Sequence, residues 1–377
     1  MSKHLIVFGT RPEAIKMAPL VTQFKKQQDW DVKVCVTAQH REMLDQVLSF
    51  FEIIPDFDLN LMRPNQNLYS LTAAILEGMK PVLEDFAPDY VYVHGDTTTS
   101  MAVGIAAFYS GAKVCHVEAG LRTFDRQYPF PEEFNRTLTG KIADYHFAPT
   151  PLSQNNLLAE NVAQSHITVT GNTVIDALLY GAAKVNQPEF SDSEVKMLQE
   201  TLDFDKKIIL VTGHRRENHG DGLINICSAL KRIALAHPDV QIVYPVHLNP
   251  NVMGPVHELL DGVDNIKLIK PLAYAAFLWL MEKSYLIITD SGGIQEEAPS
   301  LGKPVLVTRT TTERPEAVDA GTVLLLGTDS EKIVAHCNTL LTESDAYKKM
   351  SSLHNPYGDG KACERIVTFM KQLENGR

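Results

Sequence analysis

The chain lacks the features of several protein classes. Its five cysteines, spread over 377 residues, form no C-x-x-C pair, so we expect neither a disulfide framework nor a zinc site, and a reducing cytoplasm fits best. No apolar run approaches the roughly 18 residues that a transmembrane helix needs. Residues 1–9 resemble a first strand and not a signal peptide, because a short apolar run is followed at once by glycine and arginine. No G-x-G-x-x-G follows this strand, so the nicotinamide dinucleotide fingerprint is absent.

The charge and the composition narrow the choice further. Asp and Glu number 46 against 35 Lys and Arg, which makes the formal charge −11 and disfavours a general nucleic-acid or anionic-membrane binder. Hydrophobic residues make up 44% and charged residues 21%, a composition typical of folded globular proteins. The length suggests two domains, each able to bury its own core.

Short apolar, β-branched runs alternate with longer amphipathic stretches along the whole chain. This pattern is typical of parallel sheets that helices cover on both faces. It runs through once and restarts after the segment Gly171-Asn172-Thr173, which predicts an α/β protein of two doubly wound, Rossmann-like domains, 1–171 and 172–360, facing each other across a cleft. The predicted strands are 5–8, 32–36, 90–93, 114–117, 146–148 and 167–170, then 208–211, 241–244, 266–269, 286–289, 305–307 and 323–326.

Ligands of such sheets bind beyond the carboxyl ends of the strands. After the first strand, Gly9 permits a sharp turn and Pro12 favours a helix start beside Arg11 and Lys16, which together would suit an anion. An ordinary strand–helix turn with solvated charges explains this segment equally well.

Three carboxylates follow neighbouring strands in the first half. Asp96 follows the third predicted strand, Glu118 follows the fourth, and Glu132 comes shortly beyond it. Clustered carboxylates raise one another's pKa values, so one can hold a proton while another is a base. Each also has a structural interpretation: Asp96 as a helix N-cap, Glu118 as a surface-loop residue and Glu132 as a first-turn charge.

The second half repeats this arrangement. His214 follows the strand at 208–211, and Ser291, Gly292 and Gly293 follow Asp290 after the strand at 286–289. The glycines would let a phosphate approach the backbone, Glu297 could accept hydrogen bonds from ribose hydroxyls, and Arg314 could bind phosphate. A structural histidine and a tight glycine turn are the alternatives.

The motifs of the whole chain resemble those of the non-hydrolysing UDP-N-acetylglucosamine 2-epimerases. They are FGTRPEAIK, TAQHREM, VHGDT, HVEAGLR, PEEFNR, TGHRRE, DSGGIQEE, TERPE and NPYGDG. The resemblance implies a GT-B architecture, a cytoplasmic homodimer, and a final helix, 361–377, that packs back on the first domain. It implies neither a metal nor another cofactor, and the acidic charge of the chain favours neither a nucleic-acid nor a membrane partner.

The resemblance also implies roles for single residues. Asp96, Glu118 and Glu132 become the acid/base candidates, and His214 lies near the diphosphate. The implied substrate contacts are Arg11, Lys16, Asp96, Glu118, His214, Phe277, Ser291, Gly292, Gly293, Glu297 and Arg314. Some family members bind a second UDP-N-acetylglucosamine through the segment that matches Gln39, His40 and Glu42. Glu42 stands where some of those members carry glutamine. Because its carboxylate would repel the diphosphate of a second UDP-N-acetylglucosamine, we expect weak or absent activation here.

The implied reaction interconverts UDP-N-acetylglucosamine and UDP-N-acetylmannosamine, by loss of UDP to 2-acetamidoglucal and re-addition, for bacterial surface polysaccharides. Three alternatives remain open. A GT-B glycosyltransferase would need an acceptor, a sugar-nucleotide sensor would bind without turnover, and a hydrolysing relative would release free N-acetylmannosamine.

Overall fold

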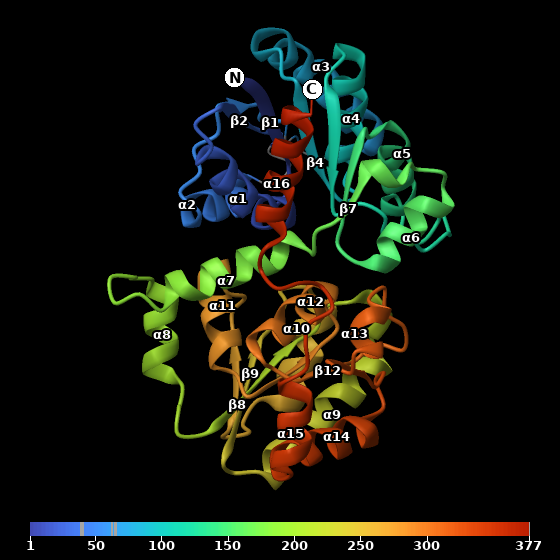
Figure 1. The fold of residues 1–377 in the computed structure, drawn as a ribbon. Coiled ribbons are helices and arrows are strands. Elements are labelled where there is room, and N and C mark those ends of the chain that lie inside the picture. The colour runs from blue at the N-terminus through green and yellow to red at the C-terminus, as the bar shows by residue number, and fades with distance from the viewer. Residues whose placement is uncertain (38–40, 62, 64–65, 377) are drawn as a thin grey trace. The chain divides into compact units, whose positions relative to one another are not determined.

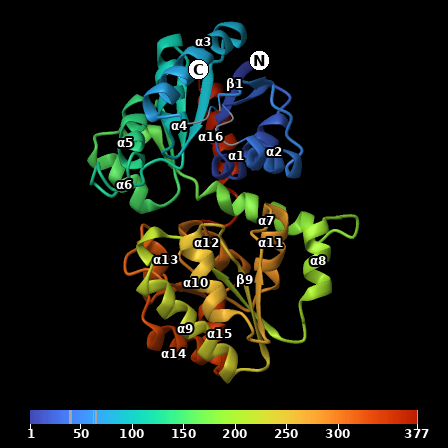
Figure 2. The same cartoon turned by 180° about the vertical axis from the view of Figure 1, so that it is seen from behind.

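The computed structural model describes residues 1–37, 41–61, 63 and 66–376, without the side chains of residues 41 and 42. The chain forms two compact units (Figures 1 and 2). The first comprises Met1–Tyr180 and Tyr357–Arg377, and the second comprises Gly181–Pro356. Within the described residues, no helix has both the length and the apolar character to cross a membrane.

The first unit contains a seven-stranded parallel sheet in the order β3-β2-β1-β4-β5-β6-β7. Its strands are β1 (Ser2–Phe8), β2 (Trp30–Val36), β3 (Phe57–Asp58), β4 (Tyr90–His94), β5 (Lys113–Val117), β6 (Tyr145–Ala148) and β7 (Ile167–Val169). Its helices are α1 (Arg11–Lys25), α2 (Arg41–Phe50), α3 (Leu68–Phe86), α4 (Thr98–Ser110), α5 (Glu132–Ile142), α6 (Pro151–Ala159), the first part of α7 (Thr173–Val185) and α16 (Ala362–Asn375).

Alternate residues of the central strands in this unit enter two different layers. Leu5, Val7 and Val91 pack in one core with α3 and α4. On the other face, the ring of Tyr92 meets Phe24 of α1 edge-on, with the ring centroids 4.9 Å apart. The two-residue period of a strand and the apolar character of both faces therefore produce a sheet covered on both sides (Figure 1).

The second unit contains a six-stranded parallel sheet in the order β10-β9-β8-β11-β12-β13. Its strands are β8 (Lys207–Thr212), β9 (Val240–Pro245), β10 (Ile266–Ile269), β11 (Leu286–Thr289), β12 (Val305–Val307) and β13 (Val323–Leu325). Its helices are α8 (Ser193–Thr201), α9 (Asp221–Ala236), α10 (Pro250–Leu260), α11 (Tyr274–Lys283), α12 (Gly292–Glu297), α13 (Pro315–Asp319), α14 (Ser330–Thr342) and α15 (Ser344–Ser351). A core of strand residues and of α9, α10 and α14 fills one side of this sheet.

The α/β class and the two Rossmann-like sheets confirm the prediction from the strand pattern. The boundary between the units falls within α7 and not at Gly171. The first turns of α7 are held in the first unit because the carboxylate of Asp176 accepts hydrogen bonds from the backbone amides of Ala362 (3.1 Å) and Cys363 (2.9 Å).

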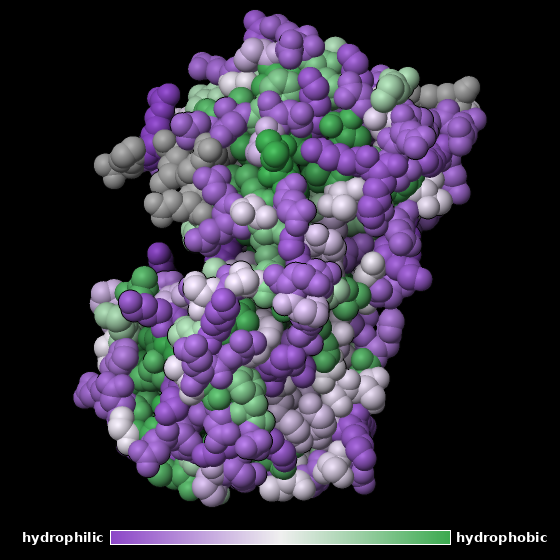
Figure 3. Space-filling view, turned by 90° about the vertical axis from the view of Figure 1, so that its left-hand side faces the viewer, coloured by the Kyte–Doolittle hydropathy of each residue, from purple (hydrophilic) through white to green (hydrophobic). Residues whose placement is uncertain are grey.

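Hydrophilic side chains cover most of the face that Figure 3 shows, with apolar side chains in smaller patches.

The turn after β5 depends on a glycine. Gly120 has a φ of +91°, and a Cβ added there would lie 2.2 Å from the carbonyl oxygen of Ser153. Gly111, which ends α4 with a φ of +83°, has nothing within 4 Å of an added Cβ. Both glycines have a positive φ, but only Gly120 lacks room for a Cβ.

We therefore expect Gly120→Ala to destabilise the protein more than Gly111→Ala. The left-handed conformation alone costs about 1 kcal/mol in the control, whereas the clash should bring the loss in Gly120→Ala to about 2–4 kcal/mol. Urea unfolding followed by circular dichroism measures both losses. Equal losses in the two variants would contradict the close approach of Gly120 to Ser153.

Candidate functional site

Glu118 is the centre of a polar cluster in the first unit. It follows β5 directly, is only 9% exposed and has a φ of +59°, a conformation that residues other than glycine adopt rarely and often at functional sites. Its Oε1 forms an ion pair with the Lys16 ammonium of α1 and accepts a hydrogen bond of 2.8 Å from the side-chain amide of Asn172. His94, the last residue of β4, places Nε2 3.5 Å from Oε2.

His94 contributes little charge to this cluster. Burial lowers the pKa of His94 to about 4, against the opposing effect of Glu118, so its ring is neutral at physiological pH. Lys16 is therefore the cation that directly offsets the buried carboxylate of Glu118.

Asp96 lies in the turn after β4, in the same electrostatic environment. Burial raises its pKa to about 6; Arg136 opposes this shift, Glu118 adds to it, Lys16 opposes it and Glu132 adds to it. The guanidinium of Arg136 lies 3.5 Å from the carboxylate. A carboxyl group with this pKa exchanges a proton near neutral pH, as acid/base catalysis requires.

The alternative interpretation of Asp96 as a helix cap is wrong. Thr97 caps α4, since its hydroxyl accepts a 3.0 Å hydrogen bond from the amide of Ser100. Nor does Glu118 lie on an exposed loop. Glu132 is indeed the first residue of α5, but its Oε2 is buried and has no hydrogen-bond partner among the described residues.

Buried charges on α5 and α1 hold the loops that carry these side chains. Glu133 accepts hydrogen bonds from the amides of Thr123 (3.0 Å) and Phe124 (2.9 Å) and pairs with Arg136 at 2.7 Å. The side-chain amide of Asn135 donates to the carbonyl oxygen of Asp96 at 2.9 Å. The start of α5 thus fixes the loop after β5 and the turn after β4 together.

Glu13 connects the turn that contains Arg11 to the turn that contains Asp96. It is 1% exposed and accepts hydrogen bonds from the amides of Gly9 (3.0 Å) and Thr10 (2.8 Å) and from the hydroxyl of Thr97 (2.6 Å). Burial raises the pKa of this carboxyl group. Arg11 itself is half-buried at the first position of α1.

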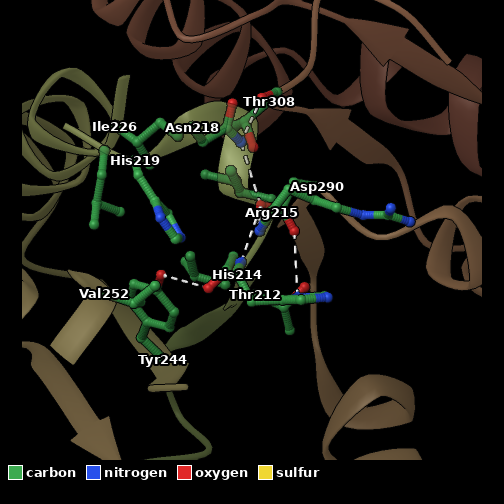
Figure 4. A pocket seen from close by; sticks show the side chains of 14 residues that line it. Thr212, His214, Arg215, Asn218, His219, Ile226, Tyr244, Val252, Asp290 and Thr308 are labelled. Carbon is green, nitrogen blue, oxygen red and sulfur yellow. Dashed lines mark hydrogen bonds and ion pairs between the residues drawn. The ribbon is translucent and has the colours of Figure 1, made fainter. Parts of the chain in front are cut away.

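His214 stands in the loop after β8 of the second unit, and Asp290 organises this loop (Figure 4). Asp290 directly follows β11, is 1% exposed, and its Oδ2 accepts hydrogen bonds from the amides of His214 (3.0 Å) and Arg215 (2.9 Å). His214 and Asp290 line a pocket, together with Asn218, Tyr244 and Thr308.

The predicted nucleotide-binding residues of the second unit lie around α12. Ser291 precedes this helix, Gly292 has open space where a Cβ would stand, and a Cβ on Gly293 would lie 3.4 Å from Oε1 of Glu297. The Arg314 guanidinium is paired with buried Glu296 through Nε.

Phe277 lies in the first turn of α11 and is partly exposed. Among the predicted regulatory residues, Gln39 and His40 lie outside the described residues, as does the side chain of Glu42.

The comparisons with known proteins agree on one family. A profile of the UDP-N-acetylglucosamine 2-epimerase family matches residues 22–371. The UDP-N-acetylglucosamine 2-epimerase of Escherichia coli O157:H7 is 60% identical over 369 residues, which cover 98% of each chain. The chain belongs to the UDP-N-acetylglucosamine 2-epimerase family.

Solved structures of the family confirm the GT-B class of the fold. A UDP-GlcNAc 2-epimerase from Neisseria meningitidis, bound to UDP-GlcNAc, is 51% identical, with a TM-score of 0.89 over 98% of this chain and 100% of that chain. The UDP-GlcNAc 2-epimerase of Methanocaldococcus jannaschii, in complex with UDP-GlcNAc and UDP, is 33% identical, with a TM-score of 0.79 over 99% of this chain and 100% of that chain.

Several residues that organise these two loop clusters carry no signal in the sequence that singles them out. Asn172 lies in the segment where the strand pattern restarts, and its side-chain amide holds Glu118. Asp290 and Glu296 belong to the DSGGIQEE motif, which does not show what each of them binds. The one available signal was their position directly after or near a strand end, which also describes many ordinary loop residues.

Asp96→Asn should stabilise the protein at neutral pH. The folded pKa of about 6 lies above the ordinary 3.8, so folding becomes less favourable as the pH rises from 3.8 to 6, and the full penalty persists above 6. Removing the charge should therefore raise the unfolding free energy by about 1 kcal/mol at pH 7.5 and by less at pH 5.

Urea unfolding at these two pH values measures this gain, with Asp359→Asn as the control. The hydrogen bonds from Arg365 lower the pKa of Asp359 to about 2, so its amide variant should lose stability at pH 7.5. A loss of stability in Asp96→Asn at pH 7.5 would contradict the desolvation of Asp96.

Proposed function

We propose that the chain catalyses the reversible C2 epimerisation of UDP-N-acetylglucosamine to UDP-N-acetylmannosamine. The observation that carries this proposal is the carboxylate cluster of the first unit, in which Lys16 pairs with Glu118 and the pKa of Asp96 is near 6. The UDP-N-acetylglucosamine bound to the Neisseria meningitidis relative supports the choice of substrate.

The C2 proton of this sugar is only weakly acidic, because no ketone lies next to it. We infer that a base removes this proton while the C1–O bond breaks. The C2–H electron pair becomes the C1–C2 double bond of 2-acetamidoglucal, and the C1–O pair leaves with UDP. In the second half, a proton returns to C2 on the opposite face, and a diphosphate oxygen of UDP attacks C1.

This sequence of steps needs an acid and a base at the sugar, which we assign to Asp96, Glu118 and Glu132. General acid–base catalysis is most effective when the pKa of the group lies near the working pH, as burial arranges for Asp96. Lys16 pairs with the buried carboxylate of Glu118, and an adjacent cation favours the charged form of a carboxyl group.

The departing UDP needs partners that strengthen as negative charge develops. We assign this role to Arg11, His214 and Arg314, with the backbone at Ser291, Gly292 and Gly293. The open space at Gly292 would allow a phosphate to approach the main chain closely. Glu297 would hold the ribose, and the partly exposed ring of Phe277 would contact the uracil.

We extend the proposal to a cytoplasmic homodimer that supplies N-acetylmannosamine units for bacterial surface polysaccharides. The cysteines fit a reducing compartment, because all five are free and buried. The dimer and the use of the product follow from the family resemblance.

Incubation with UDP-N-acetylglucosamine alone in D2O should produce UDP-N-acetylmannosamine with deuterium at C2, without added metal or nicotinamide. The elimination exchanges the C2 proton with an acidic group that equilibrates with solvent. Proton NMR follows the product, the C2 signal and the released UDP in one time course.

The same experiment separates the alternatives. Epimerisation without solvent deuterium at C2 would overturn the elimination step. Free N-acetylmannosamine would indicate a hydrolase, turnover only with an added acceptor would indicate a glycosyltransferase, and binding without turnover would indicate a sensor.

The amide variants Asp96→Asn, Glu118→Gln and Glu132→Gln should each lower kcat by about 10²–10⁴-fold, with UDP affinity little changed. In the parent enzyme, kcat/KM should change as the pH passes about 6, because Asp96 of the free enzyme then changes its protonation state. Glu77→Gln, an exposed change on α3, is the control. Near-normal kcat in all three variants would make the acid/base assignment wrong.

A further inference from the structure

The two carboxylate oxygens of Asp290 have different surroundings. Oδ2 accepts three hydrogen bonds, from the amides of His214 and Arg215 and from the side chain of Asn218 at 3.2 Å (Figure 4). These donors all belong to the loop after β8, the strand next to β11 in the sheet. Oδ2 therefore anchors the loop that carries His214.

Oδ1 of Asp290 is buried and has no hydrogen-bond partner among the described residues. It faces Nδ1 of His214 at 3.6 Å, which is longer than a formed hydrogen bond. A buried carboxylate oxygen without a donor costs free energy, so a small rotation of the partly exposed His214 ring toward Oδ1 would be favourable.

We propose that Asp290 is a positioning residue for His214: Oδ1 accepts a hydrogen bond from the Nδ1–H group of the imidazole, so that Nε2 is presented to the diphosphate of the nucleotide. A hydrogen bond to one ring nitrogen sets the tautomer and orientation of the other. The proposal rests on the proposed function only where it names the diphosphate as the group that Nε2 meets.

The charges around His214 support this role. Burial lowers the pKa of His214, Asp290 opposes this shift, and Arg215 and His247 add to it. The ring of His247, which follows β9, stacks on that of His214 with the centroids 5.5 Å apart. His219, from the same loop as Arg215, lines the same pocket. Among these groups, Asp290 is the one that favours a protonated His214.

The competing explanation is that Asp290 anchors the loop and does nothing to the ring. Two substitutions separate these roles. Asp290→Asn keeps an acceptor for the loop amides but places an NH2 group or a neutral oxygen beside Nδ1. The side-chain amide of Asn218 anchors the loop by donating to Asp290 and to the carbonyl oxygen of Thr308 at 3.1 Å. Asn218→Ala removes this anchor but leaves the carboxylate of Asp290 in place.

We expect the pKa of His214, followed by NMR in the ligand-free full chain, to fall by about one unit in Asp290→Asn and to stay near the parent value in Asn218→Ala. His214→Gln assigns the resonance. Asp290→Asn should also lower kcat by about 10- to 100-fold with the UDP dissociation constant changed by less than about threefold. An unchanged titration in Asp290→Asn, or an equal shift in Asn218→Ala, would overturn the proposal.

A second measurement needs no variant at Asp290, in case that protein does not fold. The ¹⁵N shifts of His214 in the parent chain, above its titration, should show the proton on Nδ1, and UDP should move the Nε2 resonance most. In the UDP complex both ring nitrogens should carry a proton, because Nε2 must donate to the diphosphate. A proton on Nε2 with none on Nδ1 would overturn the proposal. Because these readouts need no turnover, they remain decisive even if the epimerase reaction were disproved.

Discussion

The ion pair between Lys16 and Glu118 is the interaction on which the site of the first unit depends. It joins the first turns of α1 to the residue after β5, and Asn172 and His94 complete the surroundings of the same carboxylate. Burial disfavours the charged form of a carboxyl group, and the adjacent Lys16 ammonium opposes this effect at Glu118. Asp96 responds to this arrangement as well, since the charges of Glu118 and Lys16 act on its pKa in opposite directions.

The second unit uses a related arrangement around Asp290, but with backbone amides in place of a lysine. Oδ2 collects donors from one loop, and Oδ1 stays available for the ring of His214. In both units a buried carboxylate follows a central strand of a parallel sheet, where the carboxyl ends of the strands bring the loops together. The topology therefore explains why charged side chains that are distant in sequence meet at one sheet edge in each unit.

This topology also explains how far the sequence could be interpreted. Apolar runs predicted the strands of three or more residues, because burial on both faces requires them, whereas the two-residue strand Phe57–Asp58 is too short to form such a run. The position of Asp96 and Glu118 after strands was predictable for the same reason. The partners of these residues were not: Asn172 lies 54 positions from Glu118, and Asp176 lies 186 positions from Ala362, whose amide it binds. Such contacts depend on tertiary packing, which also moved the boundary of the units into α7.

The loops that carry these buried charges are themselves held by further buried carboxylates. Glu13 and Glu133 are each 1% exposed, and both serve mainly to bind amides or hydroxyls of neighbouring turns. Neither carboxylate contacts the substrate in the proposed reaction. Each one instead holds a turn or loop that carries a side chain assigned to that reaction. Since a desolvated carboxylate is tolerated only when donors surround it, the charged groups that perform chemistry require a second set of charged groups that keep them in place. The polar core at each sheet edge is thus larger than the set of residues that chemistry alone would demand.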